Sequence, residues 1–246
     1  MEHIDASSLS DLPSRLSYTL SFLAFTPETD GASINVSAAT LGPLIPTVLD
    51  LVYTKLLSYD ITAKPFTPQT QPEEIEKEAA PKTPKELHLE HAHILRQKTF
   101  LKNYLLKICT TEDWSPNSKL WIYMDHVALM HTGVQRGKRP ELRVEYTHLA
   151  LLLGYVVDIV AGAVLGAEGL DLETKGKVIK AWNKVVWIQN DLFARKYTVD
   201  RETGEQPVGV KSEKVTPFNK EFSAALVGVV LGVWLVVLYN AYFLRK

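Results

Sequence analysis

WIYMDHVALMHTG, residues 121–133, is an apolar segment that ends in a histidine, a threonine and a glycine. At helical spacing Leu120, Met124, Val127 and His131 fall on one face, so the imidazole continues a stripe that should face the core. An imidazole in that position is either a core histidine bonded to a backbone carbonyl or a metal ligand. From this helix alone both interpretations stay open.

The composition excludes several classes of protein. The chain has 246 residues, 46% of them hydrophobic, and a net charge of −1 from 27 basic and 28 acidic side chains. This length suits one domain with appendages, and nucleic acid is not an expected partner because no one-signed surface is indicated. The single cysteine, Cys109, excludes an intramolecular disulfide, covalent c-type haem and sites with several thiolates. The start lacks a signal-peptide pattern, so we expect a cytosolic domain.

Helical periodicity predicts an all-α domain. The first and the last of its helices each have a clear N-terminal signal. Residues 9–25 predict an amphipathic helix that Asp11 caps and Pro13 opens. The last helix of the domain begins after Asp171, because an aspartate three residues before a threonine is typical of a helix cap. This helix ends near residue 197.

A second helix is predicted from residue 37 to about 58. Pro43 and Pro46 should bend or break it near its start, and Tyr53 falls inside it. Residues 65–84 are rich in Pro, Thr, Gln, Glu and Lys, a composition that predicts a mobile loop inserted within the domain.

The third helix is expected over residues 86–110, with His88, His91 and His93 at its start. Two of these histidines could share a metal ion at helical spacing, but no known zinc pattern surrounds them, which favours a solvated helix start. Ser115 and the proline that follows it can cap the helix of residues 121–131.

Residues 145–165 predict a strongly apolar helix. Its length raises the question of a membrane span, but Asp158 would lie within the bilayer at a cost of roughly 2.5–3.5 kcal/mol. A helix that is hydrophobic almost all round also suits the centre of a helical bundle. We therefore interpret it as a core helix.

Residues 222–244 form a run of 23 residues without a charge. As a helix this run is roughly 34 Å long, against a hydrocarbon core of about 30 Å. Aromatic residues near both ends and basic residues outside them are typical of a transmembrane segment. We expect a single-pass tail anchor behind a polar linker at 201–221, with the domain at 1–200 facing the cytosol; a buried hairpin helix is the alternative. Endoplasmic reticulum, outer mitochondrial and peroxisomal membranes are all compatible with it.

Four short segments carry a family resemblance: FLAFT at 22–26, LDLVYTKL at 49–56, VALMHTG at 127–133 and AWNK at 181–184. In this order, on an all-helical framework, the chain resembles the protoglobin and globin-coupled-sensor branch of the globins, as it looks in fungal relatives. The resemblance covers about three quarters of the chain and leaves out the anchor. It implies a globin-like helical bundle.

The resemblance implies a haem b, with its iron, held between helices and ligated by His131. A neutral imidazole binds iron through one nitrogen while its other N–H is held by an acceptor. His126 and His148 are the rival ligands. His126 lies about 140° around the helix from His131, so both cannot face one pocket well.

Tyr53 matches the distal tyrosine of this branch, whose phenol would donate a hydrogen bond to bound dioxygen. The alternative is a core tyrosine that bonds a carbonyl. The further candidates for the lining of the pocket are Phe100, Leu101, Met124, Val127 and Val157.

These features together predict a membrane-tethered protein that reversibly binds O₂, CO or NO rather than turning over a substrate. Two alternatives stay open: a haem enzyme that acts on NO, nitrite or peroxide with a partner reductase, and a haem-less helical adaptor. The resemblance also suggests a homodimer formed through the last helices.

Overall fold

The computed structural model describes these parts of the chain: residues 1, 3–67, 81, 83–133 and 143–198. The chain divides into two units, 1–211 and 212–246. The second unit, with the predicted anchor at 222–244, lies outside the described residues, as does most of the predicted loop at 65–84.

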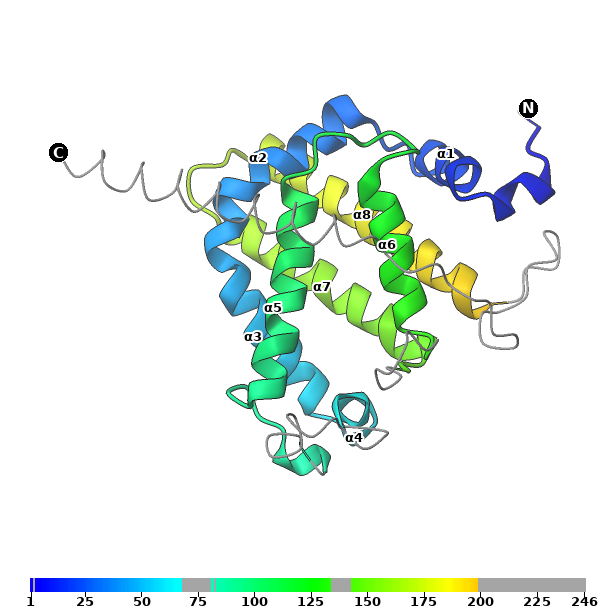
Figure 1. Ribbon diagram of the computed structural model, residues 1–246. Coiled ribbons are helices and arrows are strands. Elements are labelled where there is room, and N and C mark those ends of the chain that lie inside the picture. Colours follow the sequence, from blue (N-terminus) through cyan, green and yellow to red (C-terminus); the bar gives the residue numbers. More distant parts are fainter. Residues whose placement is uncertain (2, 68–80, 82, 134–142, 199–246) are drawn as a thin grey trace. The chain divides into compact units, whose positions relative to one another are not determined.

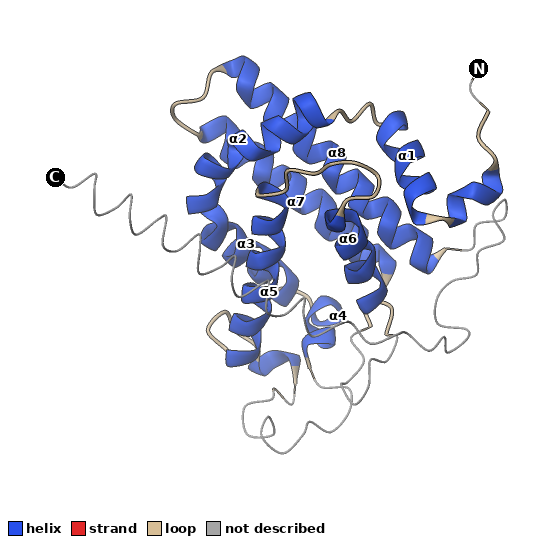
Figure 2. Ribbon diagram, turned by 45° about the horizontal axis from the view of Figure 1, so that its top comes forward, coloured by secondary structure: helices blue, strands red, loops and turns tan. Residues whose placement is uncertain are grey.

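The described part is built from helices, as Figure 2 shows, which confirms the all-α prediction. Short 3₁₀ or π turns join some of them. The α-helices are α1 (Leu12–Phe22), α2 (Ala32–Leu41), α3 (Ile45–Leu57), α4 (Asp60–Ala63), α5 (Ala92–Cys109), α6 (Lys119–Met130), α7 (Tyr146–Gly166) and α8 (Leu172–Tyr197).

Helix α8 lies at the centre of this arrangement and packs against α7, α6, α2 and α1. The helices α5 and α6 cross α7 and α8 (Figure 1). At the start of α8 the Asp171 carboxylate accepts from the Thr174 backbone N–H at 2.8 Å, as predicted. Apolar side chains at helical spacing bury its inner face: Val178, Ala181, Trp182, Val185, Ile188 and Leu192.

Helix α1 also begins where its sequence predicts. The Asp11 carboxylate accepts from the Ser14 backbone N–H at 3.0 Å, and a proline occupies the first turn. Leu16 and Leu20, four residues apart, are buried in the core. The helix is shorter than predicted, because residues 6–10 form a separate 3₁₀ turn and residues 23–26 leave the helix.

The predicted second helix proved to be two. A 3₁₀ turn, Gly42–Leu44, separates α2 from α3, which confirms the break expected at the prolines. Helix α2 nevertheless starts at Ala32, five residues earlier than predicted. Ser37, taken as its opening residue, lies inside it: its hydroxyl donates to the Ile34 carbonyl at 2.7 Å and accepts from Trp182 Nε1 at 3.1 Å. That second partner lies far away in the sequence.

Two other helix starts were predicted wrongly. Helix α5 begins at Ala92 rather than residue 86, and the His91 ring caps it by accepting from the His93 N–H at 3.2 Å. Helix α6 is capped by Ser118, whose hydroxyl accepts from the Leu120 N–H at 3.1 Å, and not by Ser115.

Helix α7 is less enclosed than the core helix that was predicted. Leu149, Val160 and Val164 are buried, but Leu151 is 68% and Leu165 is 56% exposed. Because α7 packs mainly on α8 and α3, one apolar side of it has no described neighbour. Two helical stretches, Pro27–Leu57 and Tyr146–Gly166, are long and apolar enough to cross a membrane, a test that core helices also pass.

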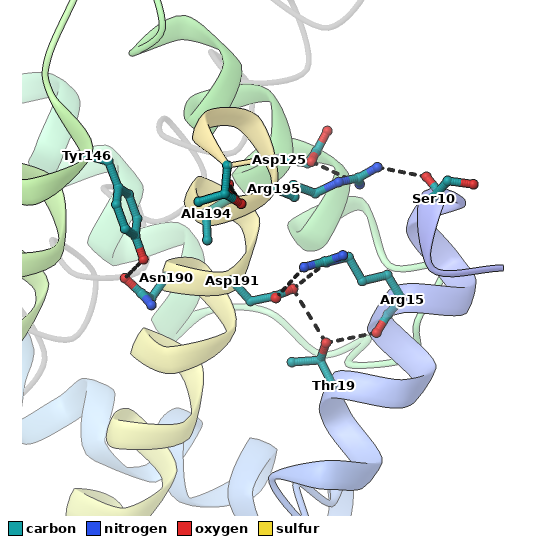
Figure 3. A network of polar contacts seen from close by, with 10 residues as sticks. Ser10, Arg15, Thr19, Asp125, Tyr146, Asn190, Asp191, Ala194 and Arg195 are labelled. Atoms are coloured by element: carbon teal, nitrogen blue, oxygen red, sulfur yellow. Dashed lines mark hydrogen bonds and ion pairs between the residues drawn. The ribbon is translucent and has the colours of Figure 1, made fainter. Parts of the chain in front are cut away.

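An ion pair joins helix α1 to helix α8, as Figure 3 shows. The Arg15 guanidinium donates to both oxygens of Asp191 at 2.7 Å. Further along, Arg195 donates to the Ser10 carbonyl at 2.8 Å and to Asp125 of α6 at 3.3 Å. A paired guanidinium and carboxylate constrain orientation as well as distance, so these contacts fix the register of three helices.

Replacing Gly31 by Ala should destabilise the domain. An added Cβ would lie 2.6 Å from Trp114 Cδ1, and that indole is buried against Phe25. Overpacking of this kind costs about 1–3 kcal/mol, measured as a lower midpoint of urea unfolding. Gly176→Ala is the matched control, since nothing lies within 4 Å of its added Cβ and alanine favours a helix. Equal midpoints for the two variants would contradict the packing described.

Candidate functional site

His131 caps the C-terminal end of α6, one residue beyond Met130. The predicted stripe leads to it: Leu120 and Met124 are buried, and Val127 packs partly buried. The backbone also holds the residue, because its carbonyl accepts from the Val144 N–H at 3.0 Å. The histidine is therefore fixed between the end of one helix and the approach to the next.

The His131 ring makes two contacts that determine its orientation. Nδ1 lies 2.7 Å from the Val127 carbonyl oxygen, and since a carbonyl only accepts, Nδ1 carries the proton. The Phe193 ring of α8 packs edge-on against the imidazole, with centroids 5.4 Å apart and planes at 89°. Rotation of the imidazole is thus restricted on two sides.

Burial makes the neutral imidazole the favoured form. Desolvation lowers the pKa of His131 from its ordinary value of 6.5, and the bond to Val127 opposes this only in part. Among the described residues no hydrogen bond involves Nε2, which keeps its lone pair. A neutral ring with one nitrogen anchored and the other available has the form of a metal-binding histidine.

Tyr53 lies in α3, as predicted, and is 5% exposed. Its ring is 5.8 Å from that of Phe66, and burial raises the pKa of its phenol well above 10.0. No carbonyl in the described part of the chain accepts from the hydroxyl, so the alternative of a core tyrosine bonded to a carbonyl finds no support. The phenol remains a protonated donor.

The other predicted lining residues occupy different environments. Met124 and Leu101 pack in the main core, Val127 packs in a smaller cluster with Phe193, and Val157 is half-buried. Phe100 is 53% exposed beneath the Arg96 guanidinium, 5.8 Å away. The role of these five residues in a pocket stays a prediction.

The rival histidines lie at other places. His126 and His148 are both half-buried, on α6 and in the first turn of α7. His88 and His91 precede α5, so they do not share a helical face; their rings meet edge-on with centroids 5.7 Å apart. Within the described residues no cluster of three or more His, Cys, Asp or Glu is placed to hold a metal ion.

Phe193, which contacts the His131 ring, was not predicted. One turn earlier on α8, Gln189 accepts a hydrogen bond from the Tyr104 hydroxyl of α5 at 2.7 Å, a contact that was not predicted either. The spacing of Gln189 and Phe193 puts them on one face. Nothing local in the sequence indicates which helix that face meets.

Two cavities found in the described part lie away from these residues. A cleft of about 290 Å³ lies between the turn at Thr26 to Asp30 and lysines of α8. A much smaller apolar cavity adjoins Cys109, Val160 and Trp182. Neither cavity is lined by Tyr53 or His131.

The neutral imidazole of His131, with Nδ1 held by a carbonyl and Nε2 available, has the chemistry of a ligand for the metal centre of a prosthetic group. Together with the helical arrangement, it defines the class as a globin-like fold with one oriented histidine.

The Protoglobin family model matches residues 12–203, and the chain belongs to the protoglobin family. Domains of this kind bind haem, and the family indicates haem-based gas binding or sensing. A comparison with curated proteins finds no match.

In the haem-free protein, His131 should exist as the tautomer protonated at Nδ1 and stay neutral below pH 6.5, because burial disfavours its charged form. Nitrogen chemical shifts of histidine-labelled protein between pH 5 and pH 8 measure both properties, and His131→Gln assigns the signal. A proton on Nε2, or protonation at or above pH 6.5, would show that the described geometry is wrong.

Proposed function

We propose that the chain is a membrane-tethered haem protein that reversibly binds a diatomic gas, O₂, CO or NO, with His131 as the proximal ligand of a haem b. The observation that carries this proposal is the oriented imidazole, whose Nδ1 lies 2.7 Å from the Val127 carbonyl. Family membership supplies the expectation of haem. The rest of the proposal follows from what the surrounding residues can do.

His131 contributes an electron pair at a fixed position. The carbonyl of Val127 and the ring of Phe193 restrict the imidazole, so little orientational freedom is lost when Nε2 binds a metal. Haem iron, when bound, supplies the coordination site for the gas. The lowered pKa of His131 keeps Nε2 unprotonated at neutral pH.

Tyr53 is proposed to donate to the gas ligand. Its phenol is buried, protonated and without an acceptor in the described part of the chain. A hydroxyl with no competing acceptor can donate to a ligand that carries partial negative charge. Such a contact would slow the release of O₂ more than that of CO.

The tether and the dimer are further parts of the proposal. The uncharged run at 222–244 is the reason to propose a tail anchor, with the globin domain in the cytosol. The fungal-type branch is proposed from the resemblance of the four short segments and not from this run. The exposed Leu151 and Leu165 on α7 offer apolar surface for a homodimer through the last helices.

Full-length protein reconstituted with haemin in mild detergent should show a Soret band that shifts on reduction and again on addition of CO. His131→Ala should lower haem retention by at least about tenfold, since even the loss of an outer partner of a metal ligand costs 10–100-fold. His126→Ala and His148→Ala are the matched controls and should retain the band. A wild type that binds no haem refutes the gas-binding function, and a band that His131→Ala leaves unchanged refutes the ligand.

The tether is tested by alkaline extraction of membranes from cells that express the chain. Full-length protein should stay in the membrane pellet, because a span of about 20 apolar residues is not released at high pH. A version that ends at residue 211, before the second unit, should appear in the supernatant. Release of both versions would refute the anchor.

A further inference from the structure

A cleft of about 290 Å³ lies between the turn that follows α1 and the first half of α8. Three of its lining residues are lysines of α8, spaced three and four residues apart, so they share one face of the helix. One carboxylate of the turn lines the other side, which leaves the lining with three positive charges against one negative. The cleft is therefore electrostatically suited to an anion. Its lining residues are Ala24, Thr26, Thr29, Asp30, Lys177, Lys180 and Lys184.

Two of these charges already satisfy each other. The Asp30 carboxylate is 5% exposed and accepts from Lys184 Nζ at 2.9 and 3.0 Å. The same carboxylate accepts from the Thr26 backbone N–H at 2.8 Å, and Lys184 also donates to the Ala24 carbonyl at 2.6 Å. This pair holds the turn against α8 and is not available to a ligand.

The other two lysines of the cleft can bind an anion. Lys180 has no hydrogen bond or ion pair within the part of the chain that the structure describes. Lys177 pairs with Glu173 at 2.6 Å, but both side chains are more than half exposed. An exposed pair of this kind contributes little to stability, so Lys177 can exchange this carboxylate for another anion.

Helix α1 runs antiparallel to α8, and this sets which residues lie beside the cleft. Arg15, near the start of α1, pairs with Asp191, near the end of α8, at 2.7 Å. Ala24, just after α1, meets Lys184, which comes seven residues before Asp191. The last residues of α1 therefore lie at the level of residues 184–188 of α8.

Two large aromatic side chains are exposed at this level. Phe22 is 76% exposed and Trp187 is 54% exposed. Trp187 continues the lysine face of α8, because it lies two turns beyond Lys180. The ring of Tyr18 lies 5.8 Å from that of Phe22 and extends the aromatic surface. Single exposed apolar residues are ordinary, but here aromatic rings adjoin two available lysines.

Lysines beside exposed aromatic rings form a surface that suits the headgroup region of a membrane. Tryptophan and tyrosine rings are favoured at the boundary between water and hydrocarbon, and lysines are attracted to an anionic leaflet. A soluble anion would occupy the lysines but leave the rings in water. Charge and apolar exposure together therefore favour a lipid surface over a small soluble ligand.

We propose that the surface formed by Phe22, Lys177, Lys180 and Trp187 docks this domain on a membrane that contains anionic phospholipids. The cleft receives an anionic headgroup between the two lysines and the turn, and the two rings enter the headgroup region. The inference uses residues of the first unit alone, so it depends neither on haem nor on the anchor at 222–244. It adds to the proposed tether a contact that depends on the charge of the lipid.

The first test measures how fast lysines of the full-length chain react with a water-soluble acetylating reagent. The chain is reconstituted in nanodiscs of phosphatidylcholine alone or with phosphatidylserine, and peptide mass spectrometry gives the rate at each lysine. Lys177 and Lys180 should react about fivefold more slowly in the anionic discs, the factor that one lysine at an anionic surface supplies. Lys102 and Lys119, exposed on α5 and α6, are the matched controls and should react equally in both. Equal rates for Lys177 and Lys180 in the two kinds of disc would overturn the proposal.

The second test removes the rings and keeps the two cleft lysines. Phe22→Ser/Trp187→Ser should lose most of the protection that anionic discs give these lysines. Because both rings are exposed, the urea midpoint in mild detergent should stay close to that of wild type. The matched control is Ile61→Ser/Ile122→Ser, which changes two side chains of similar exposure, 59% and 55%, on α4 and α6. Equal loss of protection in both double variants would show general apolar adhesion and would overturn the docking surface.

Inorganic phosphate added to the chain in phosphatidylcholine discs tests for a soluble ligand. It should leave the two cleft lysines reactive. If it protects them as strongly as anionic lipid does, the cleft binds free phosphate and the membrane proposal is overturned.

Alkaline extraction separates this inference from the proposed tether. A chain that is released at high pH, yet is protected at the cleft by an excess of anionic discs, has the docking surface without the anchor. A chain that stays in the pellet but is not protected has the anchor, and the docking surface is overturned.

Discussion

Burial of one face of α8 is the constraint on which the other helices depend. Its buried residues, from Val178 to Leu192, recur at helical spacing and meet α7, α6, α2 and α1. Close packing along such a face leaves few alternative registers, since one misplaced large side chain is costly. The same helix presents Phe193 to the imidazole of His131. The position of the histidine is therefore set by the packing of α8 as much as by its own helix.

Charge pairs complete what the apolar contacts leave undetermined. Lys184 reaches the buried Asp30 carboxylate at 2.9 Å, Arg15 binds Asp191, and Lys196 binds Asp125 at 3.0 Å. Surface pairs contribute little to stability, but these are partly shielded, and each joins α8 to a segment from far along the chain. They act mainly on geometry, because apolar surfaces can slide whereas a charge pair fixes a distance. The guanidinium of Arg15, with a bond to each oxygen of Asp191, also restricts orientation, while the two lysines act as point charges. The helix that carries His131 is held by one of them, through Asp125.

Local signals explain which features the sequence could predict. The features that were predicted correctly depend on residues within one or two turns. They are the caps at Asp11 and Asp171, the break at the prolines, and the buried stripe of Leu120 and Met124. The errors share the opposite property. Ser37 looked like a cap, yet its hydroxyl has a partner on α8, and α7 looked enclosed although no described helix covers Leu151. Of the site, the candidate residue His131 follows from periodicity and resemblance, whereas Phe193, Gln189 and Tyr104 depend on which helices meet, which no single-sequence pattern records.

An unpaired buried donor does not by itself mark the site in this protein. Core polar groups are normally paired, and the bond from Trp182 to Ser37 follows that rule. The exceptions among the described residues are Trp114 Nε1, Trp121 Nε1 and Gln189 Nε2, which lie in three different segments. The imidazole of His131 is distinguished by something else, because the Val127 carbonyl holds one of its nitrogens and the Phe193 ring packs edge-on against its plane. A side chain whose orientation is fixed by two different helices has lost rotational freedom for a single hydrogen bond, and natural chains accept such local costs mostly at functional sites.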